Sequence, residues 1–223
     1  VLVSNIGLAK KYNGLFVIDT KEALINIGKF ARNRFNGTTI GITGSSGKTS
    51  TNYFLSNALN QFGKTHKTFG NNNNLIGLSL TLSRLPYDFN FCVLELGMNN
   101  SGEIRELTNI AKPNIAVITN VSNSHIQNFK NEKEIARAKS EIFFGLEKDG
   151  VAIINSDNIW KDFLITEAKK VNAKIHLFGY SKISNTQIIK LVAENEGSTI
   201  CYDKIKKWHC LLYTSDAADD LVG

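Results

Sequence analysis

The sequence predicts an α/β fold in which a mostly parallel sheet, carrying a phosphate-binding loop, is flanked by helices. Its apolar runs are continuous rather than alternating, which is typical of strands that helices cover on both faces. These runs alternate with segments of helical periodicity, and that alternation indicates βαβ units. The predicted strands are residues 39–43 (TIGIT), 91–96 (FCVLEL), 115–119 (IAVIT), 151–154 (VAII) and 174–178 (KIHLF).

The two ends of the chain depart from this pattern. Residues 15–19 (LFVID) predict a short strand, and Thr20 is a candidate cap for a helix that runs to Arg34. The apolar positions at helical spacing in this helix are Ala23, Leu24, Ile27 and Phe30. Beyond Gly179 the segments become short and alternating, so we expect a small antiparallel β flap near the C-terminal end, formed by residues 188–193, 198–202 and 205–209.

Composition limits the classes of protein to consider. The chain has 223 residues, of which 42% are hydrophobic and 21% charged, and this composition excludes a disordered or fibrous protein. No apolar run approaches the ~18–20 residues of a membrane span, so no membrane insertion is expected. No secretory leader is visible and the three cysteines are scattered, which predicts a reducing, cytoplasmic location. The formal charge of +6 suits anionic ligands but is weak support for nucleic acid.

The last segment, residues 210–223 (CLLYTSDAADDLVG), differs abruptly from the rest. It contains no lysine or arginine and shows no amphipathic period. The string CLLYTSDAADD resembles the translation of a sequencing adapter, so we expect a foreign tail that takes no part in the fold. The alternative is a genuine acidic C-terminal turn. On the first interpretation the natural sequence stops near His209 and the chain is a fragment.

A loop rich in glycine and serine follows the strand at 39–43. Glycines let backbone N–H groups turn inward, and a helix start adds the positive end of its dipole, so this strand, loop and helix predict a phosphate cradle. Lys48 is expected to reach the β- and γ-phosphates, and Thr49 to offer a hydroxyl to Mg²⁺. Ile42 stands where the strict pattern has glycine, and the plainer interpretation is a loop that only joins strand to helix. The candidate nucleotide-binding residues are Thr43, Gly44, Ser45, Ser46, Gly47, Lys48, Thr49 and Ser50.

Two further polar residues lie at or just after predicted strand ends. Glu95 lies where α/β sheets bind ligands, so it is a candidate for a second contact to nucleotide-bound Mg²⁺. A solvated strand-end glutamate is the alternative. His125 follows the strand at 115–119 in a polar stretch, and a lone histidine is more often structural than a ligand.

Lys139 occupies an unusual place in the predicted helix 132–146. At about 100° per residue it falls in the apolar stripe. That stripe consists of Ile135, Ala138, Ile142, Phe143 and Leu146. An ammonium in a core-facing stripe is costly unless it is paired or modified. Either the side chain reaches out to solvent, or its pKa is depressed and it can react with CO₂ to give a carbamate.

Taken together, these motifs resemble those of the Mur ligases. Residues 41–50 (GITGSSGKTS) resemble the family's ATP loop, including the displaced glycine. Residues 68–77 (TFGNNNNLIG) resemble the segment that marks the members adding D-alanyl-D-alanine. The other similar segments, in family order, are 95–99 (ELGMN), 101–104 (SGEI), 120–125 (NVSNSH), 138–143 (AKSEIF) and 152–157 (AIINSD). The resemblance covers about residues 15–209.

The resemblance implies a monomeric ATP-dependent amide ligase that joins D-alanyl-D-alanine to a UDP-N-acetylmuramoyl-tripeptide through an acyl phosphate. It implies a role in peptidoglycan synthesis, cell shape and cell division, with ATP and two Mg²⁺ sites. Lys48 would act on ATP, and Thr49 and Glu95 would bind one Mg²⁺. Glu95, His125 and a carbamylated Lys139 would organise the second. The remaining implied contacts are Asn155 and Asp157 for the nucleotide, and Asn71, Asn73 and Asn74 for the muramoyl-peptide substrate.

The resemblance also implies a domain organisation. Residues 1–34 would be the remnant of an N-terminal UDP-binding domain and its linker helix, and residues 35–209 the central ATP-binding domain. The family's third domain would be absent, so the chain alone is expected not to ligate. Asn100 stands where a histidine is frequent, and Ser124 where alanine is usual. These departures leave the fine substrate contacts open.

Other functions share parts of this pattern. A sister Mur ligase or a folylpolyglutamate synthase relative would have the same ATP loop, but residues 68–77 favour the D-alanyl-D-alanine branch. A nucleotide-binding module without catalysis is a second alternative, which the retained Glu95, His125 and Lys139 disfavour. A P-loop motor acting on nucleic acid would need basic and aromatic stripes, and none stands out.

Overall fold

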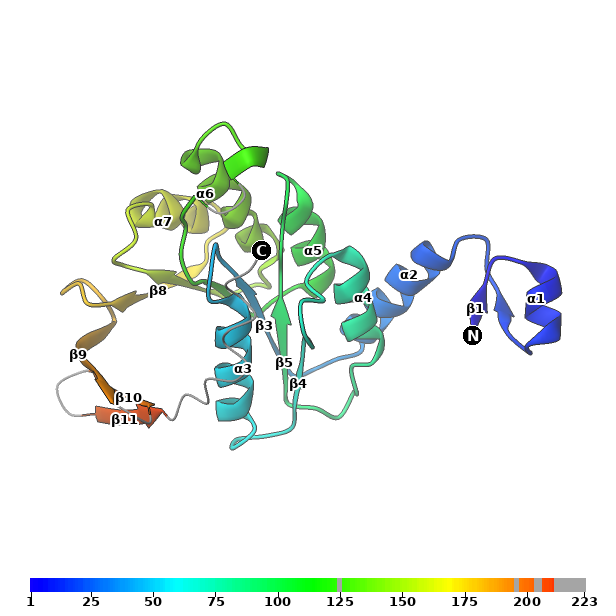
Figure 1. Ribbon diagram of the computed structural model, residues 1–223, viewed down its shortest axis with the longest axis horizontal. Helices are drawn as coiled ribbons and strands as arrows, with labels where there is room; N and C mark the ends of the chain where they lie inside the picture. The colour runs from blue at the N-terminus through cyan, green and yellow to red at the C-terminus, as the bar shows by residue number, and fades with distance from the viewer. Residues whose placement is uncertain (124–125, 195–196, 203–205, 211–223) are drawn as a thin grey trace.

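The computed structural model describes residues 1–123, 126–194, 197–202 and 206–210. Within these residues a nine-stranded sheet forms the body of the protein, in the order β11-β10-β9-β8-β7-β6-β3-β5-β4 (Figure 1). In chain order its strands are β3 (Thr38–Thr43), β4 (Thr65–Lys67), β5 (Phe91–Glu95), β6 (Ile115–Ile118), β7 (Val151–Asn155), β8 (Lys174–Gly179), β9 (Thr186–Glu194), β10 (Gly197–Tyr202) and β11 (Lys206–Cys210).

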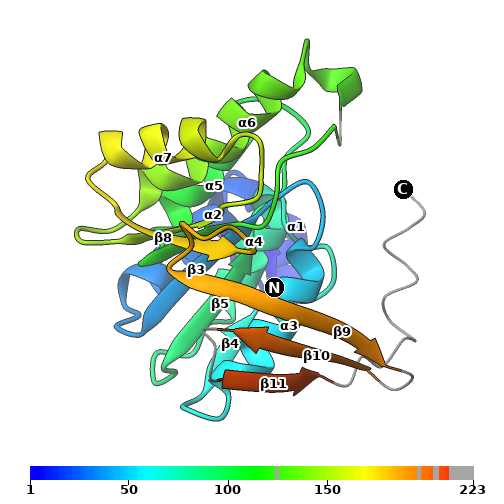
Figure 2. The same cartoon turned by 90° about the vertical axis from the view of Figure 1, so that its left-hand side faces the viewer.

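The strand directions confirm the predicted mostly parallel sheet. Every neighbouring pair from β4 across to β9 is parallel. The predicted antiparallel flap is also confirmed, because β10 runs antiparallel to both β9 and β11. Figure 2 shows these last strands side by side at the edge of the sheet. The flap therefore extends the main sheet, joined to it by the short pairing of Phe178 with Thr186.

Helices cover both faces of the sheet, as its buried strands require. One face carries α4 (Leu75–Ser83), α5 (Glu103–Ala111), α6 (Glu132–Ser140) and α7 (Lys161–Lys170), and the other carries α3 (Lys48–Leu59). Figure 2 shows α3 on the side of the sheet away from α6 and α7. The smaller core beneath α3 contains Ile40, Ile42, Val93 and Val117, with Leu55 and Leu59 packed on them. The carboxyl ends of β3, β5, β6 and β7 thereby meet at one edge.

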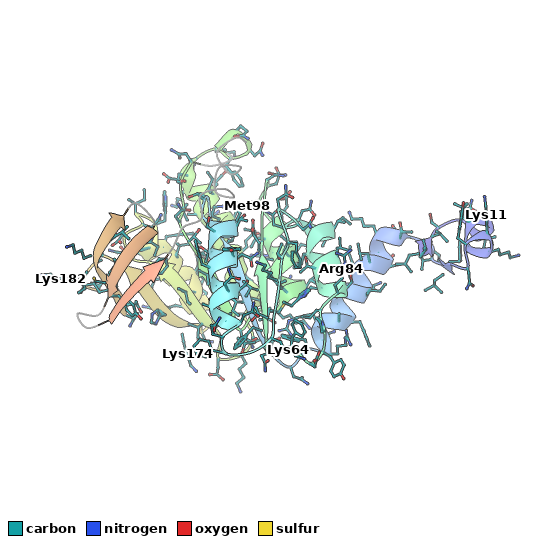
Figure 3. All side chains as sticks on the ribbon, turned by 60° about the horizontal axis from the view of Figure 1, so that its bottom comes forward. Lys11, Lys64, Arg84, Met98, Lys174 and Lys182 are labelled. Carbon is teal, nitrogen blue, oxygen red and sulfur yellow. The ribbon has the colours of Figure 1, made fainter. Side chains whose placement is uncertain are left out.

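The N-terminal unit, residues 1–18, lies at one end of the molecule (Figure 1). It consists of β1 (Leu2–Val3), α1 (Ile6–Lys11) and β2 (Leu15–Phe16), and β1 pairs with β2 in parallel. The predicted strand at 15–19 is thus shorter than expected. Helix α2 (Thr20–Asn33) joins the unit to the sheet. Lys11 in this unit and Lys182 between β8 and β9 lie at opposite ends of the molecule (Figure 3).

Helix α2 differs from its prediction in two respects. Its N-cap is Asp19 rather than Thr20, because the Asp19 carboxylate accepts hydrogen bonds from the first-turn N–H groups. The expected apolar face is partly exposed, with Phe30 71% exposed. The helix instead packs on α4 through Gly28, where a Cβ would lie 3.0 Å from the Ser79 carbonyl oxygen. Glycine thus allows a closer approach than the apolar pattern predicted.

Other boundaries were also misjudged. Helix α3 ends at Leu59, and Phe62 beyond it is exposed although apolar. The predicted helix 132–146 is α6 followed by a 3₁₀ segment over Glu141–Gly145, a tightening common at helix ends. Edge strand β4 was missed because its sequence, THK, contains no apolar run.

The expectations of no membrane insertion and of a foreign C-terminal tail can be examined only within the described residues. Among the described helices, none has both the length and the apolar character that crossing a bilayer requires. The predicted foreign tail begins at residue 210, which is the last residue of β11, and residues 211–223 lie outside the described part of the chain.

Candidate nucleotide-binding site

The phosphate loop, residues 43–50, joins the carboxyl end of β3 to the first turn of α3. Gly47 precedes α3 with a φ of 77°, a left-handed conformation that favours glycine. The first N–H groups of a helix have no partner within it, so α3 offers donors and its positive dipole end to an anion. At Gly44 a Cβ would overlap the Thr119 hydroxyl, so only glycine allows this approach.

The neighbouring strand β6 holds this loop through side chains that follow it. The N–H groups of Ser45 and Ser46 donate to the backbone oxygen and Oδ1 of Asn120, at 3.1 and 3.0 Å. Asn120 Nδ2 donates to Ser46 Oγ (2.8 Å), and Thr119 Oγ1 donates to the Ser46 carbonyl (2.7 Å). Ser45 Oγ donates to the Ser122 carbonyl (3.0 Å). The N–H groups of Ser45 and Ser46, two predicted nucleotide-binding residues, therefore anchor the loop to the segment after β6.

Lys48 and Thr49 begin α3 side by side. Lys48 Nζ donates to the Gly44 carbonyl at 3.1 Å, so the ammonium folds back over the loop. Thr49 Oγ1 donates to Glu95 Oε2 at 3.0 Å. The predicted pair of Thr49 and Glu95 is thus in direct contact.

Glu95 is buried, at 1% exposure, at the end of β5. Besides Thr49, its carboxylate accepts a hydrogen bond from Asn73 Nδ2, at Oε1 and 2.8 Å. Its backbone N–H donates to Thr68 Oγ1 at 3.1 Å. Thr68 is itself held by Asn52 Nδ2 of α3, which donates to its carbonyl at 3.0 Å. Glu95 therefore joins the phosphate loop to the segment that precedes α4.

That segment, residues 68–74, is called the asparagine loop here. Asn74 is the N-cap of α4 and accepts the Gly77 N–H at 2.9 Å, while Asn73 is bonded to Glu95. Asn71 is exposed, and its carbonyl accepts the Asn73 N–H at 2.7 Å. Two of the three predicted substrate contacts therefore also hold the loop and its neighbours in place.

A cavity of about 270 Å³ lies between the two loops. It is lined by Lys48 from the phosphate loop, by the asparagine loop and by the segment after β5, which includes Met98 (labelled in Figure 3). Its lining residues are Lys48, Asn71, Asn73, Asn74, Gly97, Met98, Asn99 and Glu103. Glu103 shapes this wall, because its carboxylate accepts the Asn99 N–H (2.7 Å) and Asn100 Nδ2 (2.9 Å).

Lys139 is 2% exposed, as the apolar stripe predicts. Burial, and secondarily the nearby Lys48 ammonium, lowers its pKa from 10.5 to about 7. Within the described part of the chain no carboxylate forms an ion pair with it. His125, its expected neighbour at a second metal site, lies outside the described residues.

Asn155 and Asp157 follow β7 at the same edge. Asn155 Nδ2 donates to the Thr119 carbonyl at 3.3 Å, and its Oδ1 accepts the Asp157 N–H at 2.9 Å. The Asp157 carboxylate accepts the N–H groups of Tyr180 (2.7 Å) and Ser181 (2.9 Å). These predicted nucleotide contacts tie together the ends of β6, β7 and β8.

The residues present fit a hard divalent cation beside a bound phosphate. The Thr49 hydroxyl and the Glu95 carboxylate supply oxygen ligands at the start of α3, the type that Mg²⁺ prefers. The described residues contain no group of three or more His, Cys, Asp or Glu side chains that could hold a metal. A cation here would complete its shell with phosphate oxygens and waters, as Mg²⁺ commonly does.

Sequence reasoning missed the residues that support this arrangement. Asn120 follows a strand and precedes a polar run, which is a signal for its place at the ligand-binding edge. Asn52 and Thr68 gave a weaker signal, because a buried polar residue in α3 or beside an edge strand does not stand out from solvated ones. Glu141 accepts the Gly102 and Arg105 N–H groups, 39 and 36 residues away in sequence, and so caps α5 through contacts that no local pattern reveals.

Comparison with known proteins agrees with this geometry. Residues 42–214 match the Mur ligase middle domain. The chain is 42% identical over 188 residues to the UDP-N-acetylmuramoyl-tripeptide–D-alanyl-D-alanine ligase of Buchnera aphidicola subsp. Baizongia pistaciae, a match that covers 82% of this chain and 40% of that protein.

Solved structures are also similar. A crystal structure of MurF from Acinetobacter baumannii superposes with a TM-score of 0.80 at 29% identity, covering 89% of this chain and 44% of that one. The MurF ligase of Thermotoga maritima, solved in complex with ADP, superposes with a TM-score of 0.76 at 25% identity, covering 88% and 45%. The chain thus spans less than half the length of each of these three relatives. With a match to the family's middle domain over most of its residues, the chain belongs to the Mur ligase family.

Proposed function

We propose that this chain supplies the ATP-binding part of a ligase that joins D-alanyl-D-alanine to a UDP-N-acetylmuramoyl-tripeptide in peptidoglycan synthesis. The observation that carries the proposal is the convergence of Lys48, Thr49 and Glu95 at the carboxyl edge of the sheet, beside a cavity. The relative that is 42% identical bears the name of this activity, and the similar Thermotoga structure contains ADP. The relative's name supports this substrate pair, and the ADP complex supports ATP as the nucleotide.

In the proposed reaction a carboxylate oxygen of the tripeptide attacks the γ-phosphorus of ATP, the bond to the bridging oxygen breaks, and ADP leaves. The amine of D-alanyl-D-alanine then attacks the acyl carbon, the C–O bond to phosphate breaks, and the nitrogen loses a proton. The acyl phosphate turns a poor leaving group into a good one, so no protein nucleophile is needed. Lys48, which lines the cavity, would neutralise charge on the phosphoryl group during transfer.

The chain's own residues have further proposed roles around this reaction. Thr49 and Glu95 would hold Mg²⁺, which when bound stabilises negative charge on the phosphates. Asn71, exposed at the cavity, would contact the muramoyl-peptide, with Asn73 and Asn74 beside it. The nucleotide would lie toward the β7 end, at the residues Asn155 and Asp157.

We also propose that Lys139 forms a carbamate. With a pKa of about 7, a large share of the side chain is neutral at neutral pH, and a neutral amine can attack CO₂. The nitrogen bonds to the carbon of CO₂ and releases one proton. The anionic product would remove the repulsion from Lys48 and, with Glu95 and His125, offer ligands to a second cation.

Two measurements test the proposal. Calorimetric titration of this chain with ADP and Mg²⁺ should show binding that Lys48→Ala abolishes and that the exposed-site control Lys169→Ala leaves unchanged. The full-length protein should release phosphate only when both UDP-muramoyl-tripeptide and D-alanyl-D-alanine are present, and Lys139→Ala should lower that rate. Equal nucleotide binding by Lys48→Ala would refute the site. Nucleotide binding without substrate-dependent turnover would favour the non-catalytic module.

A further inference from the structure

We propose that Asn73 is a positioning residue whose side-chain amide orients the Glu95 carboxylate toward the phosphate loop. The inference rests on the proposed function, because it concerns how the chain prepares the carboxylate that would meet a nucleotide-bound cation. It assigns Asn73 a role beyond the substrate contact expected from the sequence. The carrying observation is the 2.8 Å hydrogen bond from Asn73 Nδ2 to Glu95 Oε1.

The two carboxylate oxygens of Glu95 are held by donors from two different loops. Thr49 of the phosphate loop donates to Oε2, and Asn73 of the asparagine loop donates to Oε1. A carboxylate can rotate about its last side-chain bond, and that torsion is broad in glutamate. A donor at each oxygen fixes the plane of the group. If a cation took the place of the Thr49 proton donor at Oε2, the Asn73 contact would still hold Oε1.

The backbone is shaped to let Asn73 reach this position. A Cβ on residue 97 would lie 2.5 Å from Asn73 Oδ1, so the glycine in the segment after β5 leaves room for the amide. The Gly97 N–H also donates to the Asn73 carbonyl at 2.9 Å, which fixes the backbone from which the side chain projects. Gly97 thus helps to hold Asn73 where its side chain can reach Glu95.

Asn73 is also held before any ligand binds. Its N–H donates to the Asn71 carbonyl, and its neighbour Asn74 is tied to the first turn of α4. Thr68, at the other end of the asparagine loop, is buried, and its hydroxyl accepts a hydrogen bond from the Glu95 N–H. This contact fixes that end of the loop. A side chain on so fixed a backbone can orient its partner at little entropic cost.

The test is a comparison of ADP affinity with and without Mg²⁺, measured by calorimetry, in four single variants of this chain and in the double variant Asn73→Ala/Gly97→Ala. Asn73→Ala removes the donor, Asn73→Asp replaces it with a carboxylate of equal size, and Gly97→Ala obstructs it. Asn72→Ala is the matched control, since Asn72 lies in the same loop, is exposed, and within the described part of the chain donates only to the Phe69 carbonyl. Thermal unfolding of each variant reports whether it is folded.

We expect Asn73→Ala to weaken binding of Mg²⁺-ADP roughly 10- to 100-fold, the usual effect of losing a residue that orients a metal ligand, while metal-free ADP binds as before. Asn73→Asp should weaken it further through repulsion of Glu95. Gly97→Ala should have the same signature, and its effect should not add to that of Asn73→Ala, because both break one contact.

The inference is overturned if Asn73→Ala changes ADP affinity equally with and without Mg²⁺, or if it behaves like Asn72→Ala. Additive effects of Gly97→Ala and Asn73→Ala would also overturn it. If the unsubstituted chain binds no ADP under either condition, the proposed function fails first, and that result is distinct from normal Mg²⁺-ADP binding by the Asn73 variants.

Discussion

The phosphate loop and the asparagine loop flank the same carboxylate, but different parts of the chain hold them. The phosphate loop is anchored from outside, by Asn120 and Thr119, more than 70 residues away in sequence. The asparagine loop combines internal contacts, the Asn74 cap and the Asn72 contact to Phe69, with hydrogen bonds to Asn52, Glu95 and Gly97. The phosphate loop is thus held through the backbone and hydroxyl groups of its serines, whereas the asparagine loop leaves the exposed Asn71 side chain available to a ligand.

The largest expected effect is that of Gly44→Ala in the phosphate loop. The new Cβ would overlap the Thr119 hydroxyl, so we expect a loss of about 3 kcal/mol in the free energy of unfolding, at the upper end for overpacking, and no detectable ADP binding. Urea unfolding and calorimetry measure both. Asn57→Ala, at an exposed position farther along α3, serves as the control. If Gly44→Ala binds ADP normally, the loop is not held against β6 as described.

The buried lysine beside the phosphate loop predicts a pH dependence that the asparagine loop lacks. Unfolded Lys139 keeps its proton up to its ordinary pKa of 10.5, whereas the folded side chain releases it near 7. The unfolded state therefore binds more protons between these values, and stability rises with pH. Relative to Lys139→Met, the unsubstituted chain should gain about 2 kcal/mol of unfolding free energy from pH 7 to pH 9. Urea titrations in CO₂-depleted buffer measure this gain, and a constant difference would contradict it.

Asn120→Ala should show how far the phosphate loop depends on its external anchor. The change removes the bonds to the Ser46 N–H and Ser46 Oγ, so we expect a loss of about 1.5 kcal/mol in stability together with weaker ADP binding. Thermal unfolding and ADP titration are the measurements. Asn128→Ala, an exposed asparagine in the 3₁₀ turn Ile126–Asn128, is a control. Lost stability with unchanged ADP affinity would mean that the anchor does not shape the nucleotide site.

The smallest effect is expected for Asn74→Ala in the asparagine loop. Loss of the N-cap of α4 should cost about 1 kcal/mol in the free energy of unfolding. Metal-free ADP affinity should stay the same, because Asn74 does not contact the phosphate loop. Asn74→Asp, which keeps a capping oxygen, should restore stability. A loss of metal-free ADP affinity would show that the two loops are more tightly coupled than their contacts indicate.

The parallel sheet was predictable because strands such as 91–96 are continuously apolar and because a glycine-rich turn separates β3 from α3. Features that rest on single side chains were not. Strand β4 pairs with β5 at the edge of the sheet, and none of its three residues is apolar. No apolar run therefore marks it in the sequence. The N-cap of α2 is Asp19 and not the predicted Thr20. Both residue types cap helices well and the two are adjacent, so the sequence could not distinguish between them.

The candidate site was predictable to a similar extent. The pairing of Thr49 with Glu95 follows from two strand ends at one edge, which the βαβ pattern indicates. The burial of Lys139 follows from helical periodicity. The separate roles of the asparagines could not be predicted, because Asn71 and Asn74 are the same residue type. Asn74 is a helix cap only because α4 begins directly after it.

Gly28 has a mechanical consequence for the site. At this residue α2 crosses α4 almost backbone to backbone, and α4 begins at the asparagine loop. A larger residue at 28 would push α4 away from α2. The first turn of α4 would then shift, together with the asparagine loop attached to it. The small size of one glycine thus sets the distance between α2 and α4, the helix into which the asparagine loop leads.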